Sequence, residues 1–269
     1  MKVSAATVVL ATALGVAAHP SGAVHHHMHK RMEFVKAGVP QPPPQPAQST
    51  SGGSGAGAKT YKPFCGGSNS KRATAAEIAY KGNVGGTGDQ YGCNMMIVSN
   101  DIVDKYPYAA IFENKSGKDQ KCVCWNKIGP KDLIDGFFAS ANPGALKFEL
   151  PAAAKQAVVF DQNTQGGCTC GGPEIPITKN GMFGNTWVEY DFGNESNKQW
   201  SGADASCLAA VDEGMPASAL TVCGGPENTC SIINADGTGT NAFVKGTNAM
   251  DGLGLNIQGK TLHLAVTIG

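Results

Sequence analysis

The sequence predicts a mostly β protein: a disulfide-stabilised β-sandwich with short helical segments. Short runs of strand-forming residues recur along the chain, and turn residues separate them. Glycine is abundant, with 36 residues in a chain of 269, which suits a turn-rich β protein better than a helical one. All nine cysteines lie beyond residue 60. A chain of this length is long enough to bury one good-sized core.

The expected strands are short and are bounded by clusters of Gly, Asn, Asp, Ser and Pro. Two segments, residues 102–106 and 203–211, are expected to be helical. The expected strands are residues 94–98, 109–112, 122–126, 146–150, 157–161, 187–192, 220–223, 231–234 and 261–268.

The N-terminus predicts the compartment. Lys2 precedes an apolar run, residues 8–18, which ends in small residues before His19. This arrangement is typical of a secretory signal peptide, residues 1–18, cleaved after Ala18. The run is shorter than the ~20 residues that a membrane-spanning helix needs, and no other run is long enough. We therefore expect a secreted protein, extracellular or in the cell wall, with no membrane role.

A histidine-rich segment, residues 19–31, ends in the dibasic pair Lys30-Arg31. Imidazole clusters bind copper, nickel or zinc, and a mature chain starting at His19 would resemble the copper site of lytic polysaccharide monooxygenases. Proteolysis after Lys30-Arg31 would instead discard these histidines and leave only His263, too few for such a site. We therefore interpret residues 19–31 as a propeptide and expect no metal and no cofactor.

A linker is expected over residues 32–60, where Pro, Gln, Ser, Gly and Ala dominate. Residues 40–46 predict an extended proline-rich spacer, and residues 51–57 predict a flexible one. Neither stretch can bury a core. The folded domain is expected to span residues 61–269.

The cysteines are expected to form disulfides, because an oxidising secretory route favours disulfides over zinc or copper(I) thiolates. An odd number leaves one thiol unpaired. Each of the two Cys-x-Cys motifs has both thiols on one face of a strand, so the motifs can meet across neighbouring strands. A local bridge would close residues 223–230, and residues 65 and 93 are a weaker suggestion, since spacing does not establish connectivity. The nine are Cys65, Cys93, Cys122, Cys124, Cys168, Cys170, Cys207, Cys223 and Cys230.

One strand concentrates acidic and aromatic residues. Trp187, Glu189 and Asp191 alternate with apolar residues and are expected on one face of it. A polar turn, residues 193–197, follows, and Trp200 then leads to Asp204. Carboxylates beside indole rings predict an acidic cleft for a carbohydrate.

An enzymatic interpretation makes Glu189 the general acid and Asp204 or Asp191 the base or nucleophile in cleavage of a glycosidic bond. Alternating carboxylates are, however, more often the solvated face of a strand. We therefore favour a protein without catalytic activity.

A binding interpretation uses the same cleft without turnover. Trp187, Tyr190 and Trp200 would stack on the sugar rings of cell-wall glucan or chitin. The alternative for each Trp is core packing, which we expect for Trp125 after its Cys-Val-Cys motif. Trp200 lies beside a polar turn, so we expect its ring to be the most exposed.

Two Asn-x-Ser sequons, at Asn114 and Asn194, lie in predicted turns and are expected to carry glycans. A glycan on Asn194 would crowd the cleft. The chain has 21 basic and 21 acidic residues, and this formal net charge of zero argues against nucleic acid as a partner.

Five stretches occur in a familiar order behind the His-rich segment and the linker: residues 80–85, 125–130, 159–166, 200–206 and 230–233. Together they resemble the fungal secreted family of Asp f 4-like allergens. The resemblance covers most of the folded domain and implies a fungal source, secretion and IgE reactivity in exposed people. It implies no settled biochemical activity. The chain has more cysteines than the resemblance implies, notably those of the two Cys-x-Cys motifs, so its disulfide pattern is expected to differ.

A fainter resemblance links the order of Glu189, polar turn and Asp204 to thaumatin-like proteins, which are disulfide-rich β-sandwiches. Some of these bind or cleave β-1,3-glucan, and the resemblance places Glu189 and Asp204 at cleft carboxylate positions. The sequence departs from the thaumatin-like pattern at the next acidic residue, Asp212, which comes later in the chain than that pattern places it. The basic residue of the cleft is not assigned. We expect a secreted protein that binds wall polysaccharide; the alternatives are a β-1,3-glucan hydrolase and an effector that binds a host protein.

Overall fold

The computed structural model describes residues 57–67 and 81–269. The predicted signal peptide with Ala18, the propeptide with Lys30 and Arg31, and most of the linker lie outside these residues. Among the described residues, no helix has both the length and the apolar character needed to cross a membrane.

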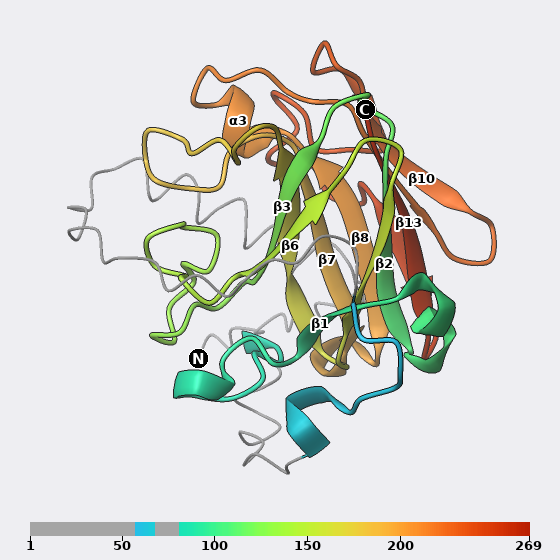
Figure 1. Cartoon of the computed structure of the whole chain (residues 1–269). Coiled ribbons are helices and arrows are strands. Elements are labelled where there is room, and N and C mark those ends of the chain that lie inside the picture. Colours follow the sequence, from blue (N-terminus) through green and yellow to red (C-terminus); the bar gives the residue numbers. More distant parts are fainter. Residues whose placement is uncertain (1–56, 68–80) are drawn as a thin grey trace, which may run out of the picture.

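Two β-sheets pack face to face and form a sandwich (Figure 1). One sheet has seven strands in the order β1-β5-β2-β13-β9-β10-β11, and the other has six in the order β12-β8-β7-β6-β3-β4. Neighbouring strands are antiparallel, except that β2 and β13 run parallel. The seven strands are β1 Met95–Val98, β2 Tyr108–Asn114, β5 Lys155–Phe160, β9 Leu220–Gly224, β10 Thr229–Ile233, β11 Gly239–Thr240 and β13 Leu262–Ile268. The six are β3 Gln120–Asn126, β4 Leu146–Leu150, β6 Thr164–Gly171, β7 Trp187–Asn194, β8 Trp200–Ser206 and β12 Leu255–Gln258.

Helical segments in the described part of the chain are short, and the mostly β prediction is confirmed. The helix expected at 102–106 is the 3-10 helix η3, Asn100–Lys105. The helix expected at 203–211 is wrong over its first half. Residues 203–206 belong to β8, where all four pair with β7 and Ala203 also pairs with β12, and only α3, Leu208–Val211, is helical. The remaining helical turns are η1 Phe64–Gly67, η2 Gly88–Gln90 and η4 Glu195–Asn197.

The main core lies between the two sheets and is built from alternate residues of their strands. Aromatic rings join the layers: the Phe160 ring on β5 lies 4.6 Å from Tyr190 and 4.8 Å from Phe192 on β7, measured between centroids. Every predicted strand overlaps an observed one. Strands β8, β11 and β12 were not predicted, because few of their residues are strand formers, and β6 was expected only as a strand carrying the second Cys-x-Cys motif.

Four disulfides cross-link the sandwich, and two of them lie within this core. The two Cys-x-Cys motifs pair across β3 and β6, as the strand spacing suggested, and Cys207 remains as the buried free thiol. Burial raises the pKa of the Cys207 thiol. The bridges are Cys65–Cys93, Cys122–Cys170, Cys124–Cys168 and Cys223–Cys230.

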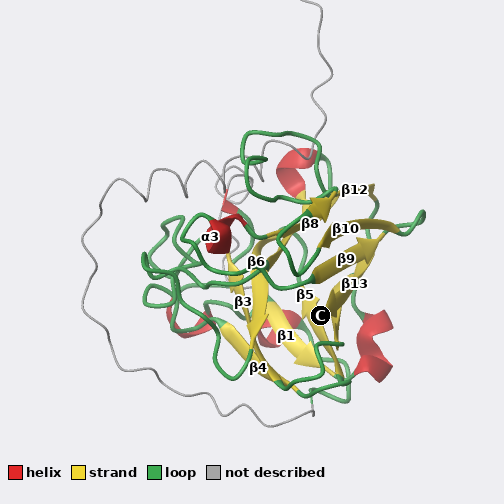
Figure 2. Cartoon of the chain, turned by 90° about the horizontal axis from the view of Figure 1, so that it is seen from above, coloured by secondary structure: helices red, strands yellow, loops and turns green. Residues whose placement is uncertain are grey.

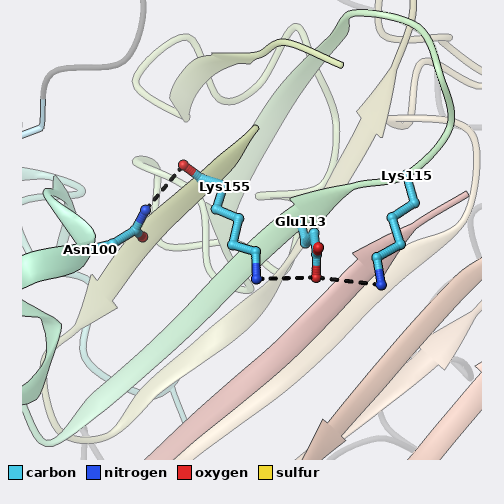
Figure 3. A network of polar contacts seen from close by, with 4 residues as sticks. All are labelled: Asn100, Glu113, Lys115 and Lys155. Carbon is cyan, nitrogen blue, oxygen red and sulfur yellow. Dashed lines mark hydrogen bonds and ion pairs between the residues drawn. The ribbon is translucent and has the colours of Figure 1, made fainter. Parts of the chain in front are cut away.

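The outer faces of the two sheets differ in what covers them. Loops gather beside α3, β3 and β6, on the side of the six-stranded sheet (Figure 2). They bury a second core that includes Trp125, Phe137 and Phe183 against the outer face of that sheet. On the outer face of the seven-stranded sheet, η3 covers a smaller third core that includes Val98, Ala109 and Val159. Further along this face, ion pairs replace apolar cover: Glu113 lies between Lys155 and Lys115 (Figure 3).

Candidate functional site

Strand β7 divides its side chains between two environments, as the alternation predicted. Val188, Tyr190 and Phe192 belong to the core between the sheets. The alternate residues project from the outer face of the six-stranded sheet, and Trp187 there joins the second core. The acidic residues of β7 therefore lie on the loop-covered side of the molecule.

The register of the sheet brings the three predicted carboxylates together. Glu189 on β7 lies directly opposite Asp204 on β8. Asp191 lies two residues further along β7, opposite Gly202. Side chains directly opposite in an antiparallel pair have Cβ atoms about 4.5–5.5 Å apart. We call Glu189, Asp191 and Asp204 the acidic cluster.

The acidic cluster is buried, and the expectation of a solvated strand face is wrong. Glu189 and Asp204 have 0% of their surface exposed, and Asp191 has 5%. Part of this burial comes from the loop before β12, whose backbone at Gly254 passes close to Asp204. Gly254 has a left-handed φ of +89°, and a Cβ there would lie 2.7 Å from the Cβ of Asp204, so only glycine allows the loop to approach this closely.

A basic residue accompanies the cluster, although the sequence did not assign one. Lys127 follows β3 and is 4% exposed. Its Nζ donates a hydrogen bond to Oε1 of Gln165 on β6. Gln165 lies directly opposite Asp191 on β7. Burial lowers the pKa of Lys127 to about 8, against the opposing effect of the Asp191 charge. The long loop after Trp125 hid this residue, since spacing does not reveal where a loop folds back.

The described residues contain no group of three His, Cys, Asp or Glu side chains placed to hold a metal ion. Asp191 instead has a polar neighbour on its own strand, because Nδ2 of Asn194 donates to Oδ2 of Asp191 over 2.6 Å. The cluster is thus a mixed network of carboxylates, an amine and amides, suited to proton exchange or to structural support.

Two of the three rings expected to stack on sugars are inside the protein. Trp187 is fully buried, and its Nε1 donates to the carbonyl oxygen of Phe183 over 2.8 Å. Tyr190 lies between the sheets and donates to the carbonyl oxygen of Trp125 over 3.0 Å. Neither ring can stack on a ligand in this fold. Trp125 is buried too, as expected, and packs edge-on against Trp187 at 5.0 Å.

Trp200 remains at the surface. It is half-buried at the start of β8 and shares the outer face of the sheet with the acidic cluster. Its cross-strand neighbour on the edge strand β12 is Gln258, and Asn256 lies two residues along the same face. Both amides are exposed. We call Trp200, Asn256 and Gln258 the Trp200 strip.

The two sequons have a structural role that the turn prediction missed. Asn114 and Asn194 end strands β2 and β7, and both are fully buried. The Nδ2 atom of Asn114, which would carry a glycan, donates to the carbonyl oxygens of Lys118 and Leu150, and that of Asn194 donates to Asp191. Each Oδ1 accepts from the serine two residues on. This geometry conflicts with glycans on the folded chain at either position.

The fold and this site define a disulfide-stabilised β-sandwich protein that has a buried acidic cluster and, on the same sheet face, a half-buried indole flanked by two exposed amides. A family model of the Allergen Asp f 4-like domain matches residues 93–268. The chain is also 31% identical over 193 residues to Allergen Asp f 4 of Aspergillus fumigatus, which covers 71% of this chain. The chain belongs to the Asp f 4-like family. The aligned region spans 58% of the length of that relative.

Proposed function

We propose that this chain is a secreted protein that binds a neutral polysaccharide, such as cell-wall glucan or chitin, without cleaving it. The observation that carries the proposal is the Trp200 strip. An aromatic ring gives a sugar an apolar face to stack on, and flanking amides can both donate to and accept from its hydroxyls. In the strip, one indole lies beside two exposed amides on adjacent strands.

Secretion is supported by the disulfides. Four bridges form in this chain, and disulfides persist in oxidising compartments. The relative from Aspergillus fumigatus is named an allergen. We extend that property to this chain as part of the proposal, so that IgE from sensitised people would bind the folded protein and lose binding after reduction.

A pull-down of the purified protein on insoluble β-1,3-glucan, chitin and cellulose tests the binding. We expect retention on at least one polymer, no released sugar in the supernatant, and loss of retention in Trp200→Ala. Tyr61→Ala is the matched control, because Tyr61 is an exposed aromatic residue outside the strip, at 54% exposure. Equal retention of Trp200→Ala and wild type contradicts the proposal, and no retention on any polymer favours a protein partner, as an effector would have.

One observation favours a second candidate, a glycoside hydrolase. Glu189 lies directly opposite Asp204 on β7 and β8, and glycosidases act with two neighbouring carboxyl groups, one as acid and the other as base or nucleophile. The complete burial of both residues argues against access by a polymer. If sugar is released in the pull-down, Glu189→Gln should abolish the release and keep binding, and an active Glu189→Gln variant would exclude this role.

A further inference from the structure

A small cavity lies at one end of the sandwich, between the two sheets and away from the acidic cluster. Its volume is about 60 Å³. Cys168 on β6 and Val188 on β7 form one wall, and Leu220 on β9 and Ile268 on β13 form the other. A single water needs about 10–15 Å³ of such space, so the cavity has room for several waters or one small molecule.

The floor of this cavity is rigid and apolar. Cys168 and Cys170 line it, and each is bridged to β3 by a disulfide. Two disulfides joining the same pair of strands restrict the motion of this floor. The space is therefore part of the folded frame, and a ligand would enter it without a large rearrangement.

The polar side chains of the lining carry no charge. They are hydroxyl and amide groups, contributed by Ser116, Gln120, Asn185, Thr186 and Ser218. We call the space between them the end cavity. These side chains give no counter-charge for an anion, which would lose its hydration on entry, and the carboxylate of Gly269, which also lines the cavity, would repel it. The chemistry of the lining therefore favours a neutral ligand.

Several donors of the lining are already used within the protein. The hydroxyl of Thr186 donates to the carbonyl oxygen of Ser218 over 2.7 Å. Asn185 and Gln120 donate through their side-chain nitrogens, to Cys170 O and Ser116 Oγ. Their amide oxygens are acceptors, so the lining suits a ligand that brings its own hydroxyl donors.

We propose that the end cavity binds a small neutral polyol, of the size of glycerol or erythritol. Polyol carbons would contact the disulfides and Val188, and polyol hydroxyls would donate to the amide oxygens of Gln120 and Asn185. This site is separate from the Trp200 strip and does not depend on the proposed function.

Saturation-transfer difference NMR on the full chain tests the proposal, with erythritol as the probe and acetate as an anion of similar size. We expect saturation transfer to erythritol and none to acetate. Ala219→Leu fills the cavity, because Ala219 is part of its lining, and should abolish the transfer. Ala152→Leu is the matched control: the residue is exposed, lies outside the lining, and should leave the transfer unchanged.

No transfer to erythritol in the wild-type protein overturns the proposal, and so does undiminished transfer in Ala219→Leu. Should Ala219→Leu fail to fold by circular dichroism, Gln120→Leu decides. This change keeps a similar side-chain volume and removes the amide. Transfer to erythritol should fall in Gln120→Leu. Full transfer in this variant would mean that erythritol binds elsewhere on the protein, and it would overturn the proposal. Equal transfer to acetate and erythritol would contradict the neutral ligand.

Discussion

The carboxylates on the two outer faces of the sandwich come from the same alternating sequence pattern and have opposite environments. On the seven-stranded sheet, Glu113 pairs with Lys155 at 3.4 Å and Lys115 at 3.7 Å, and both lysine side chains are more than half exposed (Figure 3). On the six-stranded sheet, Glu189 and Asp204 occupy equivalent outward positions and are fully buried. Alternation tells which face a side chain takes, but not whether water reaches that face.

The connections between strands cause this difference. The long loops 127–145, 172–186, 207–219 and 241–254 each begin or end on the six-stranded sheet. Their apolar residues, including Phe137, Met182 and Phe243, pack on Trp125 and Trp187 to form the second core. Charged residues near this core are desolvated, whereas those on the opposite sheet remain in water. Mutations on the two faces should therefore differ strongly in effect.

The largest expected effect is at Trp187. Trp187→Ala removes a fully buried ring from the loop-covered face and should lower the free energy of unfolding by about 3–5 kcal/mol. Trp200→Ala, a change of the same kind at a half-buried position, should cost clearly less. Urea denaturation of both variants measures the difference, and equal losses would contradict the contrast between the two sites.

The stability that each disulfide contributes should increase with the length of the loop that it closes. Replacing Cys122, Cys124, Cys168 and Cys170 together by alanine opens the loop of 48 residues that the outer bridge closes, which the chain-entropy model values at about 4 kcal/mol. The same change at Cys223 and Cys230, on the outer face of the seven-stranded sheet, opens a loop of 7 residues, valued at about 2 kcal/mol. Thermal unfolding of the quadruple and the double variant should reproduce this order, and the reverse order would be evidence against it.

Lys127 should make stability depend on pH. Its folded pKa of about 8 lies below the ordinary value of 10.5, so the unfolded chain binds more protons between these values. The free energy of unfolding should therefore rise by about 3 kcal/mol from pH 8 to pH 10.5. The rise should disappear in Lys127→Met and persist in Lys155→Met, in which an exposed lysine is changed. A Lys127→Met variant that keeps the full rise would show that Lys127 does not cause it.

The smallest loss of stability is expected at Glu113, on the outer face of the seven-stranded sheet. Glu113→Ala removes both ion pairs of Figure 3, yet exposed pairs of this kind contribute only ~0–1 kcal/mol. The change in urea midpoint should be small and should shrink further in 1 M salt. A loss comparable to that of Trp187→Ala would mean that this face is not as solvated as the structure has it.

The sequence predicted the sandwich well, because alternation and turn residues are local signals. It also predicted that the Cys-x-Cys motifs meet and that one face of β7 carries Trp187, Glu189 and Asp191. The burial of that face was not predictable, since it depends on how the loops fold back. The same limit concealed Lys127 and made a surface role plausible for Trp187.

Two further errors have local causes. The alanines of β8 favoured a helix by intrinsic propensity, but pairing with β7 and β12 prevails there. The Asn-x-Ser motifs were interpreted as glycan acceptors, but the same residue types also form a hydrogen-bonded turn, and the sequence does not distinguish the two. In the fold, the serine hydroxyl donates to the asparagine, and the asparagine nitrogen points inward.

The most direct test of the central claim is the quenching of tryptophan fluorescence by acrylamide during titration with soluble β-1,3-glucan and chitin oligosaccharides. The chain has three tryptophans, and Trp125 and Trp187 are fully buried, so Trp200 should give the quenchable signal. We predict that a bound oligosaccharide protects this signal and that Trp200→Phe loses it. Quenching that stays unchanged at saturating concentrations of both oligosaccharides would contradict binding at the Trp200 strip.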